Sequence, residues 1–218
     1  MARILFVTSR LPFPPMEGHQ LRSWHLLKAL AQRHEVVLLS LLRDDDDVAG
    51  IEEVRKYVAG VETFPIRAEQ SKFALACALL RSVLTDAPYV STKYASAALH
   101  SRIRQLAPDV DGVHFDMLPL MRNADAVPAG IPVIYNAHNV EHALLSTRAR
   151  LATTRAWTRI FLQGQLPRLL RFERETCRRA NLILACSEVD AAALQQLAPG
   201  ARMAVVPNGV DLDANRPA

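Results

Sequence analysis

The strongest constraint on the fold is an alternation of short apolar runs with segments of helical periodicity. Residues 3–8 and 36–42 are continuous apolar runs of the length of a strand. Strands that need no polar alternation are typical of parallel sheets, whose two faces are both covered. The intervening segment carries apolar residues at helical spacing, at Leu21, Trp24, Leu27 and Ala31. The opening of the chain is therefore expected to form a βαβ unit.

The same alternation continues along the chain. Further strands are expected at residues 61–65, 110–115, 132–135, 182–186 and 203–206. Helices are expected at residues 48–57, 73–84 and 90–106, and over most of 152–180. This order predicts an α/β fold of three layers, a Rossmann-like domain with a doubly wound, mainly parallel sheet.

Composition narrows the class of protein further. Half of the 218 residues are hydrophobic and 22% are charged, which fits a globular domain rather than a disordered chain. No apolar run approaches the roughly 20 residues of a membrane-spanning helix, and the start lacks the features of a signal peptide. We therefore expect a cytoplasmic protein. The three cysteines, Cys77, Cys177 and Cys186, are predicted to be reduced and mostly buried.

Charge is unevenly distributed. Between Arg148 and Arg179, nine arginines stand against only two glutamates. This segment is either a solvated helix face or a surface for anionic lipid headgroups or a phosphorylated acceptor, which would place the protein peripherally on the inner face of the membrane. Nucleic acid is not an expected partner, because no recognised nucleic-acid-binding pattern accompanies the arginines. The acidic run Asp44–Asp47 is interpreted as a solvated loop before the next helix.

Candidate functional residues follow the strands, because ligands of doubly wound sheets collect at the carboxyl ends of the strands. Four segments meet this criterion. They are the Pro-rich loop ending in Gly18-His19, the stretch His114-Phe115-Asp116, the stretch His138-Asn139-Val140-Glu141-His142, and Pro207-Asn208-Gly209-Val210-Asp211.

Taken in this order, the segments resemble the amino-terminal domain of the family 4 glycosyltransferases. Residues 138–141 look like the family's His-Asn-Val-Glu segment, and Ser187-Glu188 looks like its strand-to-helix turn. Residues 206–211 are similar to its closing strand. The resemblance covers nearly the whole chain and is closest to sugar transferases of bacterial exopolysaccharide clusters. Family members are retaining enzymes of the GT-B fold, in which two Rossmann-like domains face each other.

The resemblance implies a hexosyltransferase that uses a nucleotide-diphosphate sugar as donor, with no tightly bound cofactor and no metal. The acceptor would be a sugar or a lipid-linked glycan in envelope or exopolysaccharide synthesis. Residues 1–206 would be the acceptor-binding domain, and residues 207–218 the start of a linker to a donor domain. The family's Glu-x7-Glu donor motif is not found in the sequence. The chain alone is therefore expected to be an inactive half, derived from a longer protein.

The resemblance also assigns roles to individual residues. His114 takes the position of a histidine that holds the transferred sugar; a structural histidine is the alternative. Asp116 would orient the acceptor. Gly18 would let backbone amides approach the donor diphosphate, as helix starts can, and His19 stands where many members have another glycine. Asn208 and Gly209 would contact substrate at the closing strand.

The segment 138–142 has a rival interpretation. It also spells His-x-x-Glu-His, a zinc motif that requires both histidines on one regular helix. Because His138 follows an apolar strand closely, we expect it on a loop, with His142 in the first turn of a helix. Asn139 and Glu141 would then line the acceptor cleft. A zinc hydrolase and a non-catalytic nucleotide- or sugar-binding module remain the alternative functions. The dinucleotide fingerprint and the phosphate-binding loop are both missing from the sequence.

Overall fold

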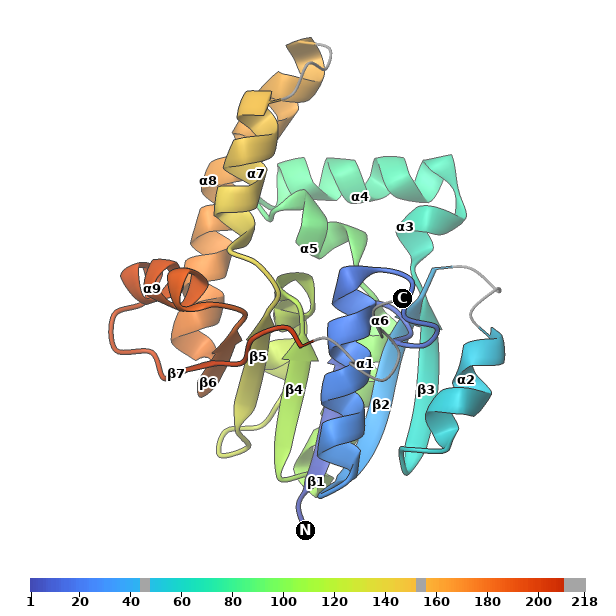
Figure 1. The fold of residues 1–218 in the computed structure, drawn as a ribbon. Helices are drawn as coiled ribbons and strands as arrows, with labels where there is room; N and C mark the ends of the chain where they lie inside the picture. The colour runs from blue at the N-terminus through green and yellow to red at the C-terminus, as the bar shows by residue number, and fades with distance from the viewer. Residues whose placement is uncertain (44–47, 152–155, 210–218) are drawn as a thin grey trace, which may run out of the picture.

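The computed structural model describes residues 1–43, 48–151 and 156–209, which form one sheet of seven parallel strands with helices on both faces. Across the sheet the order is β3, β2, β1, β4, β5, β6, β7 (Figure 1). The strands are β1 Arg3–Thr8, β2 Glu35–Leu42, β3 Gly60–Pro65, β4 Gly112–Asp116, β5 Val133–Ala137, β6 Leu182–Ala185 and β7 Met203–Val205. The predicted doubly wound, Rossmann-like α/β fold is confirmed.

Helices connect the strands and lie on both sides of the sheet. They are α1 Gly18–Ala31, α2 Val48–Arg55, α3 Arg67–Gln70, α4 Lys72–Leu84, α5 Tyr89–Lys93, α6 Ala97–Leu106, α7 Glu141–Leu151, α8 Ala156–Arg179 and α9 Glu188–Leu197. Two 3-10 segments, η2 Ala107–Asp109 and η3 Leu118–Ala126, flank β4. In Figure 1, α7 and α8 rise together beyond the sheet, and α4 lies across the carboxyl ends of the strands.

Each face of the sheet has its own apolar core, as expected where successive side chains point to opposite faces. On one face, Phe6 and Leu38 pack with Trp24 of α1 and Val54 of α2. The other core is larger and includes Leu5, Val7, Leu99, Phe115, Leu169, Cys177 and Leu194. Helices α6, α8 and α9 therefore cover the face opposite α1.

Three expectations need correction. The helix predicted at 90–106 is two helices, because Ser96 caps the start of α6 through a hydrogen bond from the amide of Leu99. Leu21 does not lie on the buried face of α1; it is 41% exposed, and Arg22 and Ser23 are buried instead. Cys77 is exposed on α4, whereas Cys177 is buried and Cys186 is half-buried.

Part of the charged sequence lies outside the described residues, namely Asp44–Asp47, Arg155 and the stretch from Val210 to Asp211. In the described part of the chain, no helix has the length and apolar character needed to cross a lipid bilayer.

Candidate functional site

The chain reverses its direction across the sheet between β1 and β4, which are hydrogen-bonded neighbours. Strands β2 and β3 are added on one side of β1, and β4 to β7 on the other. Such a switch point leaves a crevice at the carboxyl ends of the two central strands, where ligands of this architecture bind. Ser9 and Met117 follow these strands, and α1 begins beside them.

Asp116, the last residue of β4, is the centre of a buried polar network at this point. Its carboxylate accepts hydrogen bonds from the Ser23 hydroxyl, from Nδ2 of Asn136 at 2.6 Å and from Nε2 of His138 at 2.8 Å. Burial alone would raise the pKa of Asp116, but the charge and hydrogen bond of His138, together with the nearby His114, outweigh it and hold this pKa well below its usual range. The network therefore retains an ionised carboxylate only 1% exposed to solvent.

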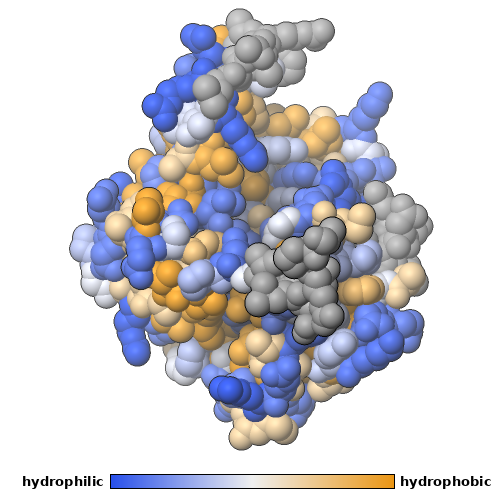
Figure 2. Space-filling model, in the orientation of Figure 1, coloured by the Kyte–Doolittle hydropathy of each residue, from blue (hydrophilic) through white to orange (hydrophobic). Residues whose placement is uncertain are grey.

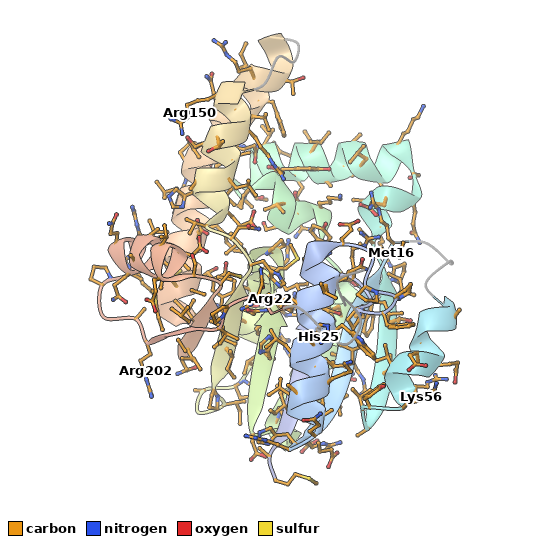
Figure 3. The ribbon with its side chains drawn as sticks, viewed as in Figure 1. Met16, Arg22, His25, Lys56, Arg150 and Arg202 are labelled. Atoms are coloured by element: carbon orange, nitrogen blue, oxygen red, sulfur yellow. The ribbon has the colours of Figure 1, made fainter. Side chains whose placement is uncertain are left out.

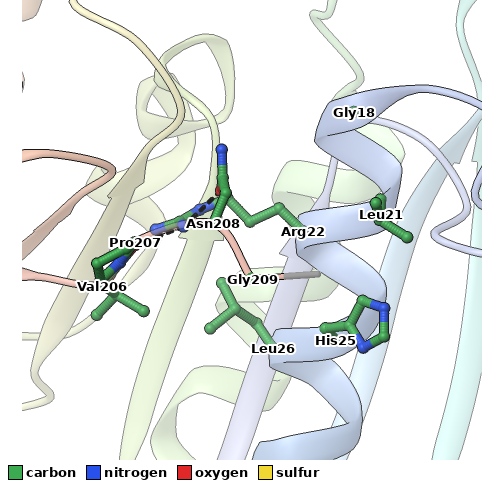
Figure 4. Close-up of a pocket in the computed structure, with 9 residues that line it drawn as sticks. All are labelled: Gly18, Leu21, Arg22, His25, Leu26, Val206, Pro207, Asn208 and Gly209. Carbon is green, nitrogen blue, oxygen red and sulfur yellow. Dashed lines mark hydrogen bonds between the residues drawn. The ribbon is translucent and has the colours of Figure 1, made fainter. Parts of the chain in front are cut away.

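Arg22 connects this network to the segment that follows β7. Its guanidinium donates to Oδ1 of Asn136, at 3.0 Å from Nη2 and 3.3 Å from Nε. Nη1 donates to the carbonyl of Val206 at 2.6 Å and to Oδ1 of Asn208 at 2.9 Å. Figure 4 shows Arg22 reaching from α1 to these residues. One side chain thus joins α1, β5 and the end of the described chain.

His114 lies within β4 rather than after it. Its ring stacks on Phe6 of the neighbouring strand, with ring centroids 4.3 Å apart and planes 9° from parallel. Among the described residues Nε2 of His114 has no hydrogen-bond partner, and it lies 4.0 Å from the nearer carboxylate oxygen of Asp116. Because the residue is only 4% exposed, its nitrogen faces the polar network and not open solvent.

The accessible rim of the site is formed by the start of α1. Glu17 and Gln20 form a reciprocal capping box, and the carboxylate of Glu17 also accepts a hydrogen bond from Arg10 at 2.5 Å. His19 lies beside them, with Nδ1 3.4 Å from Glu17. Its ring meets the ring of His138 edge to face at 6.4 Å. Burial lowers the pKa of His19, while the Glu17 carboxylate acts in the opposite direction.

Gly18 is the first residue of α1, and the backbone at this position does not require a glycine. A Cβ atom built on Gly18 would meet no atom of the described residues within 4 Å, and the φ of Gly18 is not in the left-handed region. The residue borders a groove of about 420 Å³ between α1 and the segment after β7. The groove is also lined by Leu21, Arg22, Asn208 and Gly209 (Figure 4). The structure thus brings Gly18, Asn208 and Gly209 together at one groove.

The segment from His138 to His142 divides between a loop and a helix, as predicted. β5 ends at Ala137, and α7 begins at Glu141. His138 turns toward Asp116, whereas Nδ1 of His142 lies 2.6 Å from the buried carboxylate of Glu173 in α8. Among the described residues, no three His, Cys, Asp or Glu side chains are grouped closely enough to hold a metal ion.

Asn139 and Glu141 lie on the side of the site nearest α7. Asn139 is exposed. Burial raises the pKa of Glu141, and the charge of Glu173 adds to the rise. Glu141 also lines a second cavity, of about 280 Å³, between α5, α7 and α8, with Tyr89, Leu145 and Phe161 among its apolar walls.

Sequence reasoning missed the residues that hold the network together, which are Arg22, Ser23 and Asn136. A usable signal was present in α1: polar Arg22 and Ser23 directly precede Trp24, which lies on the apolar face of the helix. Polar side chains on the inner face of a helix require partners. At the sheet, Asn136 stands directly beside Asp116 in the parallel register of β4 and β5.

Comparison with known proteins adds three findings. The sequence model of Glycosyltransferase Family 4 matches residues 17–214. Two solved structures of HepE from Anabaena share the fold, one in complex with UDP and glucose (20% identity, TM-score 0.55) and one in complex with UDP-glucose (19% identity, TM-score 0.54). Each alignment covers 98% of this chain but only 46% and 45% of the HepE chains. The search of curated proteins found no match.

Proposed function

Because this chain belongs to Glycosyltransferase Family 4, we propose that it provides the acceptor-side half of a retaining glycosyltransferase that uses a nucleotide-diphosphate sugar. The observation that carries this proposal is the network around Asp116, which lies at the switch point of the sheet next to an open groove. The HepE structures contain UDP, glucose or UDP-glucose, which supports the choice of donor.

The proposal includes a second domain. The chain spans less than half of the length of HepE, and a Rossmann-like domain approaching 200 residues would account for the remainder. The second domain would hold most of the donor, and the cleft that aligns donor and acceptor would form between the two halves. Transfer by this chain alone is therefore not expected.

The residues of the site divide into a rim that touches substrate and an inner network that holds the rim. We assign His19, the backbone at Gly18, Asn208 and Gly209 to the substrate-contacting rim. His138 is hydrogen-bonded to Asp116, and its ring packs edge to face against the ring of His19. Asp116 therefore fixes the position of His138, which in turn supports His19 at the rim. The inner network thus fixes where the rim presents its hydrogen-bonding groups.

His114 acts in this scheme as a positioning residue rather than a general base. In a retaining reaction on the front face of the sugar, the leaving phosphate accepts the proton of the acceptor hydroxyl. The site then has to hold and orient the sugar, which is a matter of preorganised polar groups. The free Nε2 of His114, 4.0 Å from Asp116, suits such an electrostatic role.

We place the acceptor on the α7 side of the site, at Asn139 and Glu141. The cavity beside Glu141 has apolar walls from Leu145 and Phe161 with polar groups at its edge, which suits a glycan linked to a lipid. Such an acceptor fits synthesis of a cell envelope or an exopolysaccharide.

The decisive experiment measures sugar transfer from radiolabelled UDP-glucose to lipid-linked acceptors extracted from the source cells. We expect no transfer by the 218-residue chain alone and transfer with retained anomeric configuration by the product of the complete gene. Asp116→Asn should lower that rate by about 10²-fold, the scale for removing a preorganised polar group, while the exposed Asp109→Asn leaves it unchanged.

Two results would contradict the proposal. Transfer by the 218-residue chain alone would remove the half-enzyme assignment. Binding of a nucleotide sugar without transfer by the complete gene product, across a range of acceptors, would favour a non-catalytic binding module instead.

A further inference from the structure

Helix α4 presents an apolar stripe to solvent. Exposed apolar or weakly polar residues recur along it at helical spacing: Phe73, Ala76, Cys77, Leu80, Val83 and Leu84. Phe73 is 80% exposed and Leu84 is 74% exposed. In Figure 2, orange side chains lie along the upper edge of the molecule, over α4. This arrangement is the reverse of an ordinary surface helix, whose apolar stripe faces the core.

The charges around this stripe are all of one sign on the helix itself. α4 contains no acidic residue, and Lys72 and Arg81 flank the stripe on its two sides. The inner side of the helix is held by small buried residues, Ala78 and Ser82. An apolar stripe bordered by cations is the pattern of helices that lie in the interface of a membrane.

A hollow lined with arginines adjoins the carboxyl-terminal end of α4. It has a volume of about 520 Å³ and receives Arg81 from α4, Arg122 from η3 and Arg179 from α8. None of these three forms an ion pair with a described carboxylate, whereas Arg168 and Arg171 in its wall both pair with Asp86. The guanidinium of Arg122 donates to the carbonyl of Ser91.

Arg81 and Arg122 lie close enough in this hollow for their positive charges to repel each other. Burial lowers the pKa of Arg122, and the charge of Arg81 lowers it further, while the Asp125 carboxylate acts in the opposite direction. The lining of the hollow has five arginines and only three carboxylates, those of Asp86, Asp125 and Glu175, so its net charge is positive and attracts an anion. Arginine suits phosphate because its fork of donors matches phosphate oxygens.

We propose that α4 and the arginine hollow form one docking surface for a lipid bilayer that contains anionic phospholipid. The apolar stripe enters the interfacial region, and the hollow receives the phosphate of a headgroup. Charge complementarity selects this occupant, because an apolar protein partner would leave the surrounding cations without anions. This surface involves only the base of the arginine-rich segment, at Arg168, Arg171 and Arg179, and not its tip at Arg150 (Figure 3).

The test is flotation of the chain with vesicles of phosphatidylcholine alone and with added phosphatidylglycerol. We expect binding to the anionic vesicles, weakened by salt. Leu80→Glu combined with Leu84→Glu should abolish it, and Arg81→Gln should weaken it about fivefold, since a basic residue near an anionic surface contributes about 1 kcal/mol. Matched controls are Val189→Glu, an exposed apolar position on α9, and Arg202→Gln near β7, far from α4 (Figure 3).

Four results would overturn the proposal. One is that the wild-type chain fails to float with anionic vesicles at low salt. Another is that the α4 double variant floats as well as Val189→Glu. Alternatively, inorganic phosphate shifts the NMR signals of the hollow while no vesicle binds, which would identify a site for a soluble anion. Self-association lost in the double variant, again without vesicle binding, would identify a second copy as the occupant. These measurements involve no nucleotide sugar, so they succeed or fail independently of the proposed function.

Discussion

The buried carboxylate of Glu173 in α8 lies 2.6 Å from Nδ1 of His142 in α7, so the two helices are joined at the first turn of α7. The same carboxylate accepts the backbone amides of Glu141 and His142, at 2.8 and 3.1 Å. Glu173 therefore satisfies two of the amides that a helix start leaves free, and it opposes the positive end of the helix dipole. His142 is part of a helix cap, whereas His138 belongs to the network of Asp116.

The first prediction concerns zinc. Because the two histidines of the His-x-x-Glu-His stretch bind different carboxylates, the purified chain should carry no stoichiometric zinc. Elemental analysis of protein prepared without chelators checks this. About one zinc per chain that disappears in His138→Ala and persists in His100→Ala, a surface histidine, would show a metal site after all.

The second prediction concerns acid stability. The pKa of Asp116 lies below its ordinary value of 3.8, so the ionised carboxylate contributes stability that is present above that value and is lost as pH falls below it. Asp116→Asn should lower the free energy of unfolding at neutral pH by about 3 kcal/mol, because it removes a buried carboxylate that accepts hydrogen bonds from three side chains. The free energy of unfolding of this variant should also fall less steeply than that of the wild type as pH drops below 4.

Urea unfolding at several pH values measures both effects. The exposed Asp109→Asn serves as the control and should follow the wild type. An Asp116→Asn variant as stable as the control at neutral pH would show that the network is held together by other groups.

The third prediction concerns Arg22. Arg22→Leu removes the hydrogen bonds to Val206 and Asn208 and leaves Oδ1 of Asn136 without its partner, which should cost about 1–3 kcal/mol. Amide hydrogen exchange should rise at residues 203–209, where Arg22 holds the chain. Lys28→Met, elsewhere on α1, should leave exchange at these residues unchanged. Equal exchange in the two variants would mean that the segment is fixed by β7 alone.

The fourth prediction separates packing from chemistry at His114. His114→Ala uncovers the face of Phe6 and should destabilise the fold by on the order of 2 kcal/mol. His114→Phe keeps a ring on Phe6 and removes the unpartnered nitrogen, so its stability should match or exceed the wild type. In the product of the complete gene, both variants should lower sugar transfer by about 10²-fold. A stable and fully active Phe variant would limit His114 to packing.

The sequence was sufficient to predict the succession of strands along the chain, because parallel strands buried on both faces appear as apolar runs at 3–8, 36–42 and 182–186. It was not sufficient where a local contact outweighs periodicity. The helix expected at 90–106 is divided because the Ser96 side chain caps a new helix, an effect that hydrophobic spacing does not register.

The structure places the candidate residues at the carboxyl edge of the sheet, where the sequence predicted them, but their arrangement was not predicted. The strand expected at 110–115 already contained His114, although His114 was assigned to the strand end; β4 continues to Asp116, so Asp116 takes the end position. A shift of strand end by one or two residues changes which side chain reaches the edge. Arg22 could not be assigned either, because its partners at Asn136 and Asn208 are more than 100 residues away and only the folded sheet brings them together.

The central position of β1 has a consequence for synthesis of the protein. On one side, β1 pairs with β2 soon after both are made. On the other side its partner is β4, and the backbone amide of Arg3 donates a hydrogen bond to the carboxylate of Asp111, 108 positions later. At ribosomal speeds of about 5–20 residues per second, this edge stays unpaired for roughly 5–20 s. During that time the nascent chain presents an open apolar strand edge, at which a chaperone can bind or a second nascent chain can pair.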